Sequence, residues 1–152
     1  MKILLITDQY PPEIRAISFM MQELAEYFTE KGNVVTVITS MPLNIIEKDG
    51  YINVPKKEVK NGVSIIRLKI PFKIRKGYLY KALNQLSIPA LFYRKIRKLV
   101  KGRIDVVMVY TPPLSLGLIG IKVKKVYGAK FLLNVQDIFP QNAIDLGILR
   151  NN

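Results

Sequence analysis

The chain has 152 residues, of which 49% are apolar, so it is long enough for one domain with a buried core and too apolar to be disordered throughout. It has no cysteine and no histidine, which excludes disulfides, thiolate metal sites, cysteine nucleophiles, His-dependent triads and zinc hydrolases. Its net charge of +13 favours anionic partners, which are phosphorylated ligands, acidic lipid or nucleic acid.

The first forty residues predict a β-α-β unit. Lys2–Thr7 is an apolar run without alternation, which is typical of a strand buried on both faces. After the two prolines of Asp8–Glu13, apolar residues recur with helical spacing, on a face made of Ile17, Met20, Met21, Leu24 and Phe28. Gly32 can end this helix in the left-handed conformation, and Asn33–Thr39 is a second buried strand. The unit predicts a parallel sheet, whose ligands gather at the carboxyl ends of the strands.

The middle of the chain is predicted to be less regular. Residues 40–61 form a long connection, in which Tyr51–Val54 is a candidate for a brief edge strand. Turn signals stand at Asp49-Gly50 and Asn61-Gly62. The following run, Gly62–Ile70, predicts a strand close to the sheet edge.

The second half alternates helices and strands. Tyr78–Lys101 has helical spacing, and Pro89 is expected to kink it or split it in two. A strand, a helix, a strand and a short helix are then predicted over Asp105–Tyr110, Leu114–Tyr127, Lys130–Gln136 and Gln141–Leu149. The whole order predicts an α/β fold, a doubly wound and mostly parallel sheet of the Rossmann-like kind.

The charge is unevenly placed, because there is no acidic residue between Val59 and Ile104. The second half of the long helix carries a cationic face made of Arg94, Lys95, Arg97, Lys98 and Lys101. We expect this face to lie on an anionic membrane surface, and the alternative is a solvated helix face. No run approaches the ~20 apolar residues of a membrane-spanning helix. The expected location is therefore cytoplasmic, with peripheral attachment to the inner face of the cell membrane.

Three proline-containing loops follow predicted strands, at Asp8–Arg15, Thr111–Pro113 and Asp137–Pro140. Each could simply stop a strand, but three such loops at one sheet edge favour a binding cleft. The candidate cleft residues are Glu13, Arg15, Thr111, Pro112, Gln136 and Gln141.

Several of these stretches together resemble the amino-terminal domain of the family 4 glycosyltransferases. They are Tyr10-Pro11-Pro12-Glu13 with Ala16-Ile17-Ser18, Asn33–Thr39, Tyr110-Thr111-Pro112-Pro113-Leu114, and Asn134–Gln141 with Ala143–Gly147. The last of them is most similar to the subgroup that builds surface polysaccharides with amino- or deoxysugars. The family usually has glycine in the first loop, where this chain has Ile14-Arg15, and an arginine could bind phosphate there instead.

The resemblance implies two facing Rossmann-like domains, known as the GT-B fold. The first domain binds a lipid-linked or glycan acceptor and meets the membrane, and the second holds the nucleotide-sugar donor. Asp137 would lie near the transferred sugar, as the catalytic carboxylate, although a helix cap would explain it too. The similarity covers only the first domain over residues 1–152. We therefore expect a truncated enzyme, or one that needs a separate donor-domain chain.

The resemblance implies a nucleotide sugar as substrate but no tightly bound cofactor, and no residue pattern demands a metal. A non-catalytic basic module that binds membrane or nucleic acid is the alternative. Nucleic acid is the less favoured partner, because the chain has no helix-turn-helix, RNP-type strand or zinc motif. A self-sufficient dinucleotide enzyme is disfavoured, because no G-x-G-x-x-G follows the first strand.

Overall fold

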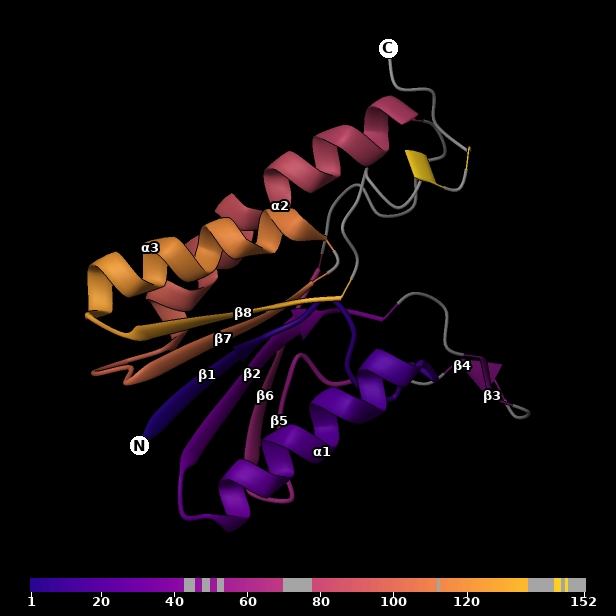
Figure 1. Cartoon of the computed structure of the whole chain (residues 1–152). Coiled ribbons are helices and arrows are strands. Elements are labelled where there is room, and N and C mark those ends of the chain that lie inside the picture. Colours follow the sequence, from indigo (N-terminus) through magenta and orange to yellow (C-terminus); the bar gives the residue numbers. More distant parts are fainter. Residues whose placement is uncertain are drawn as a thin grey trace.

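The computed structural model describes residues 1–42, 46–47, 50–51, 54–69, 78–111, 113–136, 144–145 and 147. A six-stranded sheet in the order β5-β6-β2-β1-β7-β8 forms its centre (Figure 1). The strands are β1 (Lys2–Ile6), β2 (Val34–Ser40), β5 (Lys57–Lys60), β6 (Val63–Leu68), β7 (Val106–Thr111) and β8 (Lys130–Val135). Neighbouring strands pair in parallel, except β5, which is antiparallel to β6. The predicted α/β, mostly parallel, Rossmann-like fold is confirmed.

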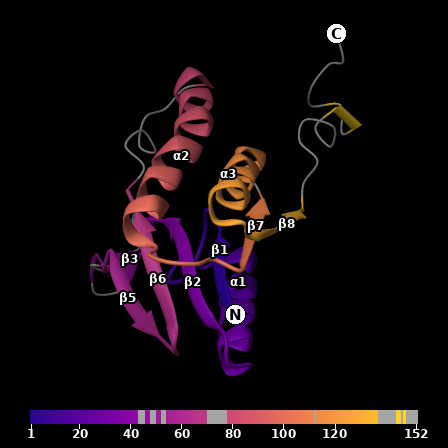
Figure 2. The same cartoon turned by 90° about the vertical axis from the view of Figure 1, so that its left-hand side faces the viewer.

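Helices cover both faces of the sheet (Figures 1 and 2). Helix α1 (Ala16–Glu30) packs on one face, over a core that includes Leu5, Met21, Ala25, Val37 and Ile65. Helices α2 (Tyr78–Leu99) and α3 (Gly117–Tyr127) pack on the other, with the short helix η1 (Leu114–Leu116). That core includes Ile6, Phe92, Ile96, Val107 and Ile119. The residues of the inner strands β1, β2, β6 and β7 are shared between these two cores, which explains why those strands are apolar without alternation.

The β1-α1-β2 unit follows its sequence signals closely. Gly32 ends the turn after α1 with a φ of +77°, and its N–H donates to the Thr29 carbonyl oxygen over 2.9 Å. The predicted apolar face is wrong at one position, because Met20 is 50% exposed. The fully buried positions of α1 are Ser18, Met21 and Ala25. The buried face is therefore centred on these three positions, and Met20 lies about 100° around the helix from Met21, away from the sheet.

The edge of the sheet beyond β6 differs from the prediction. Strand β5 forms within the predicted connection, so β6 lies inside the sheet and β5 is the edge strand. Three of its four residues are charged, which hid it from a search for apolar runs and suits an exposed edge. The turn signal at Asn61-Gly62 does join two strands, with positive φ at both residues. A small separate hairpin, β3 (Ile46–Glu47) and β4 (Gly50–Tyr51), includes only Tyr51 of the predicted strand 51–54.

The second half of the chain tests two further predictions. Helix α2 is continuous through Pro89, so the predicted split does not occur. Strand β8 forms where a strand was predicted over Lys130–Gln136, and much of it is exposed because it is the last strand of the sheet. The predicted helix over 141–149 falls largely outside the described residues. No helix within the described ranges is both long and apolar enough to cross a membrane.

Candidate functional site

The carboxyl ends of the parallel strands bring polar residues together at one edge of the sheet. Thr39 of β2 pairs in register with Arg67 of β6, and Tyr110 of β7 pairs with Asn134 of β8. Between them the Thr7 N–H, just after β1, donates to the Ile38 carbonyl oxygen over 3.1 Å. This carboxyl edge is where ligands bind in open α/β sheets.

The first loop is attached to this edge by its own polar groups. Ser40 Oγ donates to the Asp8 carbonyl oxygen over 2.8 Å and also contacts the Asp8 carboxylate. Thr7 Oγ1 donates to the Gln9 carbonyl oxygen over 3.1 Å and accepts from the Gln9 N–H over 3.3 Å. The loop therefore leaves β1 in a defined direction.

Two predicted cleft residues, Thr111 and Gln136, meet at Asn134. The buried Thr111 Oγ1 donates to the Asn134 carbonyl oxygen over 3.2 Å, and Gln136 Nε2 donates to Asn134 Oδ1 over 2.6 Å. The Thr111 hydroxyl thus fixes β7 to β8, whereas Gln136 is exposed at the strand end.

The other predicted cleft residues lie elsewhere or outside the described ranges. Glu13 and Arg15 are in the loop before α1, where the Arg15 N–H donates to the Glu13 carbonyl oxygen over 3.1 Å. Arg15 is the residue that precedes the helix, and its side chain is exposed. Pro112, Gln141 and the predicted catalytic residue Asp137 fall outside the described residues.

Buried polar atoms without a hydrogen-bond partner gather near the same edge, within the part of the chain that the structure describes. They are Gln9 Oε1 in the first loop, Ser18 Oγ in the first turn of α1, Thr39 Oγ1 at the end of β2, Arg67 Nε near the end of β6 and Ser115 Oγ in the helical turn after β7. Unsatisfied buried polar groups cost free energy and are rare in folded proteins. The carboxyl edge therefore differs from the centre of the sheet, where the buried side chains are apolar.

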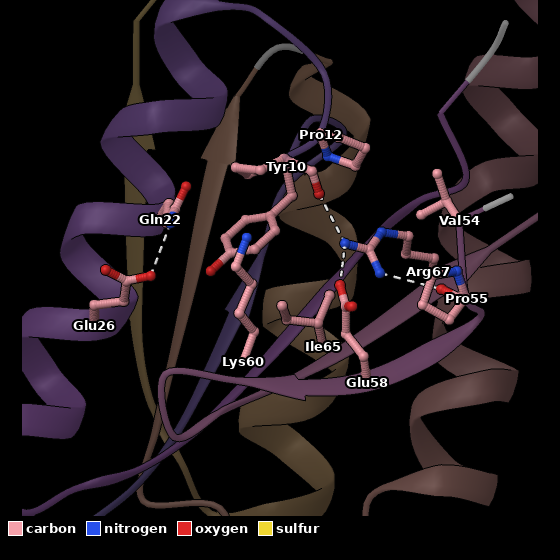
Figure 3. A pocket seen from close by; sticks show the side chains of 11 residues that line it. Tyr10, Pro12, Gln22, Glu26, Val54, Pro55, Glu58, Lys60, Ile65 and Arg67 are labelled. Atoms are coloured by element: carbon pink, nitrogen blue, oxygen red, sulfur yellow. Dashed lines mark hydrogen bonds and ion pairs between the residues drawn. The ribbon is translucent and has the colours of Figure 1, made fainter. Parts of the chain in front are cut away.

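A cavity of about 220 Å³ lies on the α1 side of the sheet, beside the first loop (Figure 3). Arg67 forms its inner wall, with a side chain only 2% exposed. Its Nη2 is 2.6 Å from Glu58 Oε1 and donates to the Pro11 carbonyl oxygen over 2.7 Å, while its Nη1 donates to the Pro55 carbonyl oxygen over 3.1 Å. One guanidinium therefore holds together the first loop, the segment before β5, and β5 itself.

The ionisable groups of this cavity have shifted pKa values. Burial raises the pKa of Tyr10, and the nearby charge of Glu26 adds to this, so the phenol is neutral at physiological pH. Hydrogen bonds from Gln22 Nε2 (2.8 Å) and Asn61 Nδ2 (2.9 Å) to Glu26 Oε1 lower the pKa of Glu26, so that its carboxylate is ionised. At physiological pH the cavity therefore contains a protonated phenol that can donate a hydrogen bond, on Tyr10, and an ionised carboxylate that can accept one, on Glu26.

Glu58 and Arg67 were not among the residues predicted from the sequence. One feature of the sequence could have indicated this ion pair. Arg67 is the single charged residue of the largely apolar strand Val63–Leu68, and a buried charge needs a partner of opposite charge. The partner's identity depends on the β5–β6 pairing, which the charged sequence of β5 concealed.

The predicted cationic face is present on the surface. Arg94, Lys95, Arg97, Lys98 and Lys101 are all exposed, whereas Phe92 and Ile96 of the same helix are fully buried. Among the described residues, no group of three or more acidic side chains is placed to hold a metal ion.

Comparison with known proteins identifies the fold. No protein-family model matches the chain, and no curated protein matches its sequence. Two crystal structures of the C-terminal domain of a Pyrococcus furiosus hydrogenase match with TM-scores of 0.57 and 0.58 and identities of 23% and 22%. Both matches cover 88% of this chain and 90% of the hydrogenase domain.

Sucrose-phosphate synthase from Thermosynechococcus elongatus matches with a TM-score of 0.61 and 12% identity. This match covers 99% of the present chain and 36% of the synthase chain. One fold can carry unrelated activities, as a hydrogenase domain and a sugar-phosphate synthase illustrate. The chain has a Rossmann-like α/β fold, which it shares with the hydrogenase domain and with about a third of the synthase.

Proposed function

We propose that the chain is the acceptor-side, N-terminal domain of a glycosyltransferase similar to family 4. It acts in polysaccharide biosynthesis, where a sugar passes from a nucleotide-sugar donor to a lipid-linked or glycan acceptor. The likeness to sucrose-phosphate synthase carries the proposal, because nearly the whole chain superposes on about a third of that enzyme. The sequence resemblance of the first loop and of Asn134–Gln141 points to the same class of enzyme.

The chemistry of the carboxyl edge suits a sugar acceptor. Thr7, Thr39 and Ser40 are buried beneath this edge, whereas Asn134 and Gln136 reach its surface with amide groups, which both donate and accept hydrogen bonds. The acceptor hydroxyl attacks the anomeric carbon of the donor, the bond from that carbon to the phosphate oxygen breaks, and the nucleoside diphosphate leaves. We assign Asp137, which follows Gln136 in the chain, as the base that takes the proton of the acceptor hydroxyl.

The donor half is supplied by a further domain or by a second polypeptide. Positioning the donor against the acceptor provides much of the rate of such a transfer, so the chain alone should have little activity. The cationic face of α2 holds the domain peripherally on an anionic membrane, on the cytoplasmic side, close to a lipid-linked acceptor.

A reconstitution assay tests this function. Transfer from a panel of nucleotide sugars to a polyprenyl-linked acceptor is measured with the chain alone, with a donor-binding polypeptide alone, and with their mixture. We expect transfer in the mixture, and Asp137→Asn should lower kcat by about 10²–10⁴-fold. Glu23→Gln, a matched change on the exposed face of α1, should leave it unchanged. Absence of transfer from every mixture, or equal rates for the two variants, would contradict the proposal.

A further inference from the structure

Three segments that are distant in sequence build the cavity between α1 and the β5–β6 hairpin. Tyr10-Pro11-Pro12 of the first loop forms one side, Gln22 and Glu26 of α1 form a second, and the hairpin with Val54-Pro55 forms the third (Figure 3). Its volume of about 220 Å³ is smaller than the roughly 300–1,000 Å³ of sites for drug-sized ligands. The space therefore suits one small molecule, or one ring of a larger ligand.

The charges that line the cavity balance one another. Arg67 is bound to Glu58, and Lys60 lies close enough to Glu26 to contribute to the lowering of its pKa. The cavity is thus close to neutral, although the chain as a whole has a net charge of +13. A phosphate or carboxylate ligand would find both lining cations already compensated by glutamates, so the charges favour a neutral ligand.

The lining of the cavity has an apolar part and a hydrogen-bonding part. Pro11, Pro12, Val54, Pro55 and Ile65 supply an apolar surface, which the ring of Tyr10 extends. Hydrogen-bonding groups come from Tyr10, Gln22, Glu26 and Lys60.

The two best-defined hydrogen-bonding groups complement each other. The Tyr10 phenol is neutral and lines the cavity, where its hydroxyl can act as a donor. Gln22 and Asn61 both donate to Oε1 of Glu26, and this ionised carboxylate is the acceptor of the cavity lining. A sugar ring has the matching form, with an apolar C–H face and a rim of hydroxyls that donate and accept.

We propose that this cavity is a subsite for one neutral sugar residue of the acceptor glycan. The C–H face of the sugar packs on the prolines and on Ile65, and its hydroxyls bind Tyr10 and Glu26. The proposal rests on the proposed function, since it names the acceptor of that reaction as a glycan. The first loop joins the cavity to the carboxyl edge, so the bound residue is a neighbour of the reacting sugar.

Titration of the whole chain by two-dimensional NMR tests the subsite. The probes are methyl α-D-glucopyranoside and N-acetyl-D-glucosamine, with glucose 1-phosphate as the anionic counterpart. We expect the neutral probes to bind with Kd values of about 1–10 mM and to shift the amides around Tyr10, Glu26 and Arg67. Tyr10→Phe removes one hydroxyl and should weaken binding about tenfold. Glu23→Gln, on the exposed face of the same helix, should have no effect.

Several results would overturn the subsite. These are the absence of cavity shifts with both neutral probes, equal binding by Tyr10→Phe and Glu23→Gln, or tighter binding of glucose 1-phosphate at the cavity. Thermal unfolding of Tyr10→Phe confirms that the variant is folded. Sugar binding needs no donor half, so the two proposals fail separately. Transfer without sugar binding at the cavity rejects the subsite alone, and binding without transfer rejects the transferase and leaves the cavity as a sugar site outside that reaction.

Discussion

Arg67 is the residue that connects most of the candidate site. It lies in a strand whose other buried members are apolar, and its guanidinium reaches Pro11, Pro55 and Glu58. Taking a guanidinium out of water is costly, so this position is stable only because a carboxylate and two carbonyl oxygens surround it. The planar fork of arginine reaches all three at once, which a lysine could not do.

Replacing Arg67 should therefore be destabilising in a way that depends on Glu58. In Arg67→Met the Glu58 carboxylate, whose side chain is 28% exposed, loses its cation, and we expect a loss of about 3 kcal/mol in the free energy of unfolding. Adding Glu58→Met removes the carboxylate that has lost its partner, and the double variant should regain about 1–2 kcal/mol of the lost free energy of unfolding. Urea unfolding of the two single variants and the double variant measures this coupling. Additive effects of the two single changes would show that the pair does not interact.

The raised pKa of Tyr10 makes the free energy of unfolding decrease at high pH. Its pKa is raised in the folded state, so the unfolded chain loses the phenolic proton first as the pH increases. The stability due to the neutral phenol is complete below about pH 10, the ordinary pKa of tyrosine, and is lost as the pH rises toward the raised value. Urea midpoints from pH 8 to pH 11 should fall more steeply for the natural protein than for Tyr10→Phe. Parallel curves for the two proteins would contradict the shift.

Among the elements, those with a strong apolar pattern were predicted well, β8 included, whereas the charged edge strand β5 was not. The β1-α1-β2 unit is central, so its apolar pattern reports its burial directly. Strand β5 is charged because one of its sides has no neighbouring strand, and β8 is apolar although much of it is exposed. Edge position is a property of the sheet, and the local sequence of a strand does not encode it.

The packing of α3 on β8 depends on a glycine. A Cβ at Gly120 would overlap the ring of Phe131, whereas a Cβ at Gly117 would meet Leu133 Cδ1 at an ordinary 3.5 Å. We therefore expect Gly120→Ala to lower the free energy of unfolding by about 1–3 kcal/mol, because Phe131 must move. Gly117→Ala should raise it by about 0.5–1 kcal/mol, because alanine favours the helix. Urea unfolding of the two variants measures both changes, and equal signs would contradict this view of the interface.

On the scale of the whole molecule, the charge distribution separates two surfaces. The exposed cations of α2 have apolar core residues on their inner side and no acidic neighbour in the sequence between Val59 and Ile104. The cavity beside α1 is balanced, with two glutamates for its two cations. One surface therefore attracts anions, while the other suits neutral ligands.

Removing charge from the α2 face tests its role at a membrane. We expect the chain to co-sediment with anionic vesicles and not with zwitterionic ones. Lys95→Gln with Lys98→Gln should weaken binding about 30-fold, at about 1 kcal/mol for each cation. The control is Lys56→Gln with Lys57→Gln, which removes the same charge from exposed residues at β5. Equal weakening by both pairs would indicate attraction by net charge alone, and binding to RNA in physiological salt would favour the nucleic-acid alternative.

The candidate site was only partly predictable from the sequence. Strand ends indicated the edge of the sheet where Thr111 and Gln136 meet, since parallel strands place their ends together. The bonds of Asn134 to both residues, and the attachment of Asp8 to Ser40, depend on which strands are neighbours. No spacing along the chain reports that choice.

The order of the main elements, the parallel frame and the cationic helix face could all be derived from the amino-acid sequence. These follow from periodicity and composition, which act over a few residues and need no knowledge of distant contacts. The cavity enclosed by residues near positions 10, 26, 55 and 67 becomes visible only in the folded chain. That cavity requires β5 to pair with β6 and α1 to cross β6, and both arrangements arise when distant segments bury their apolar faces together.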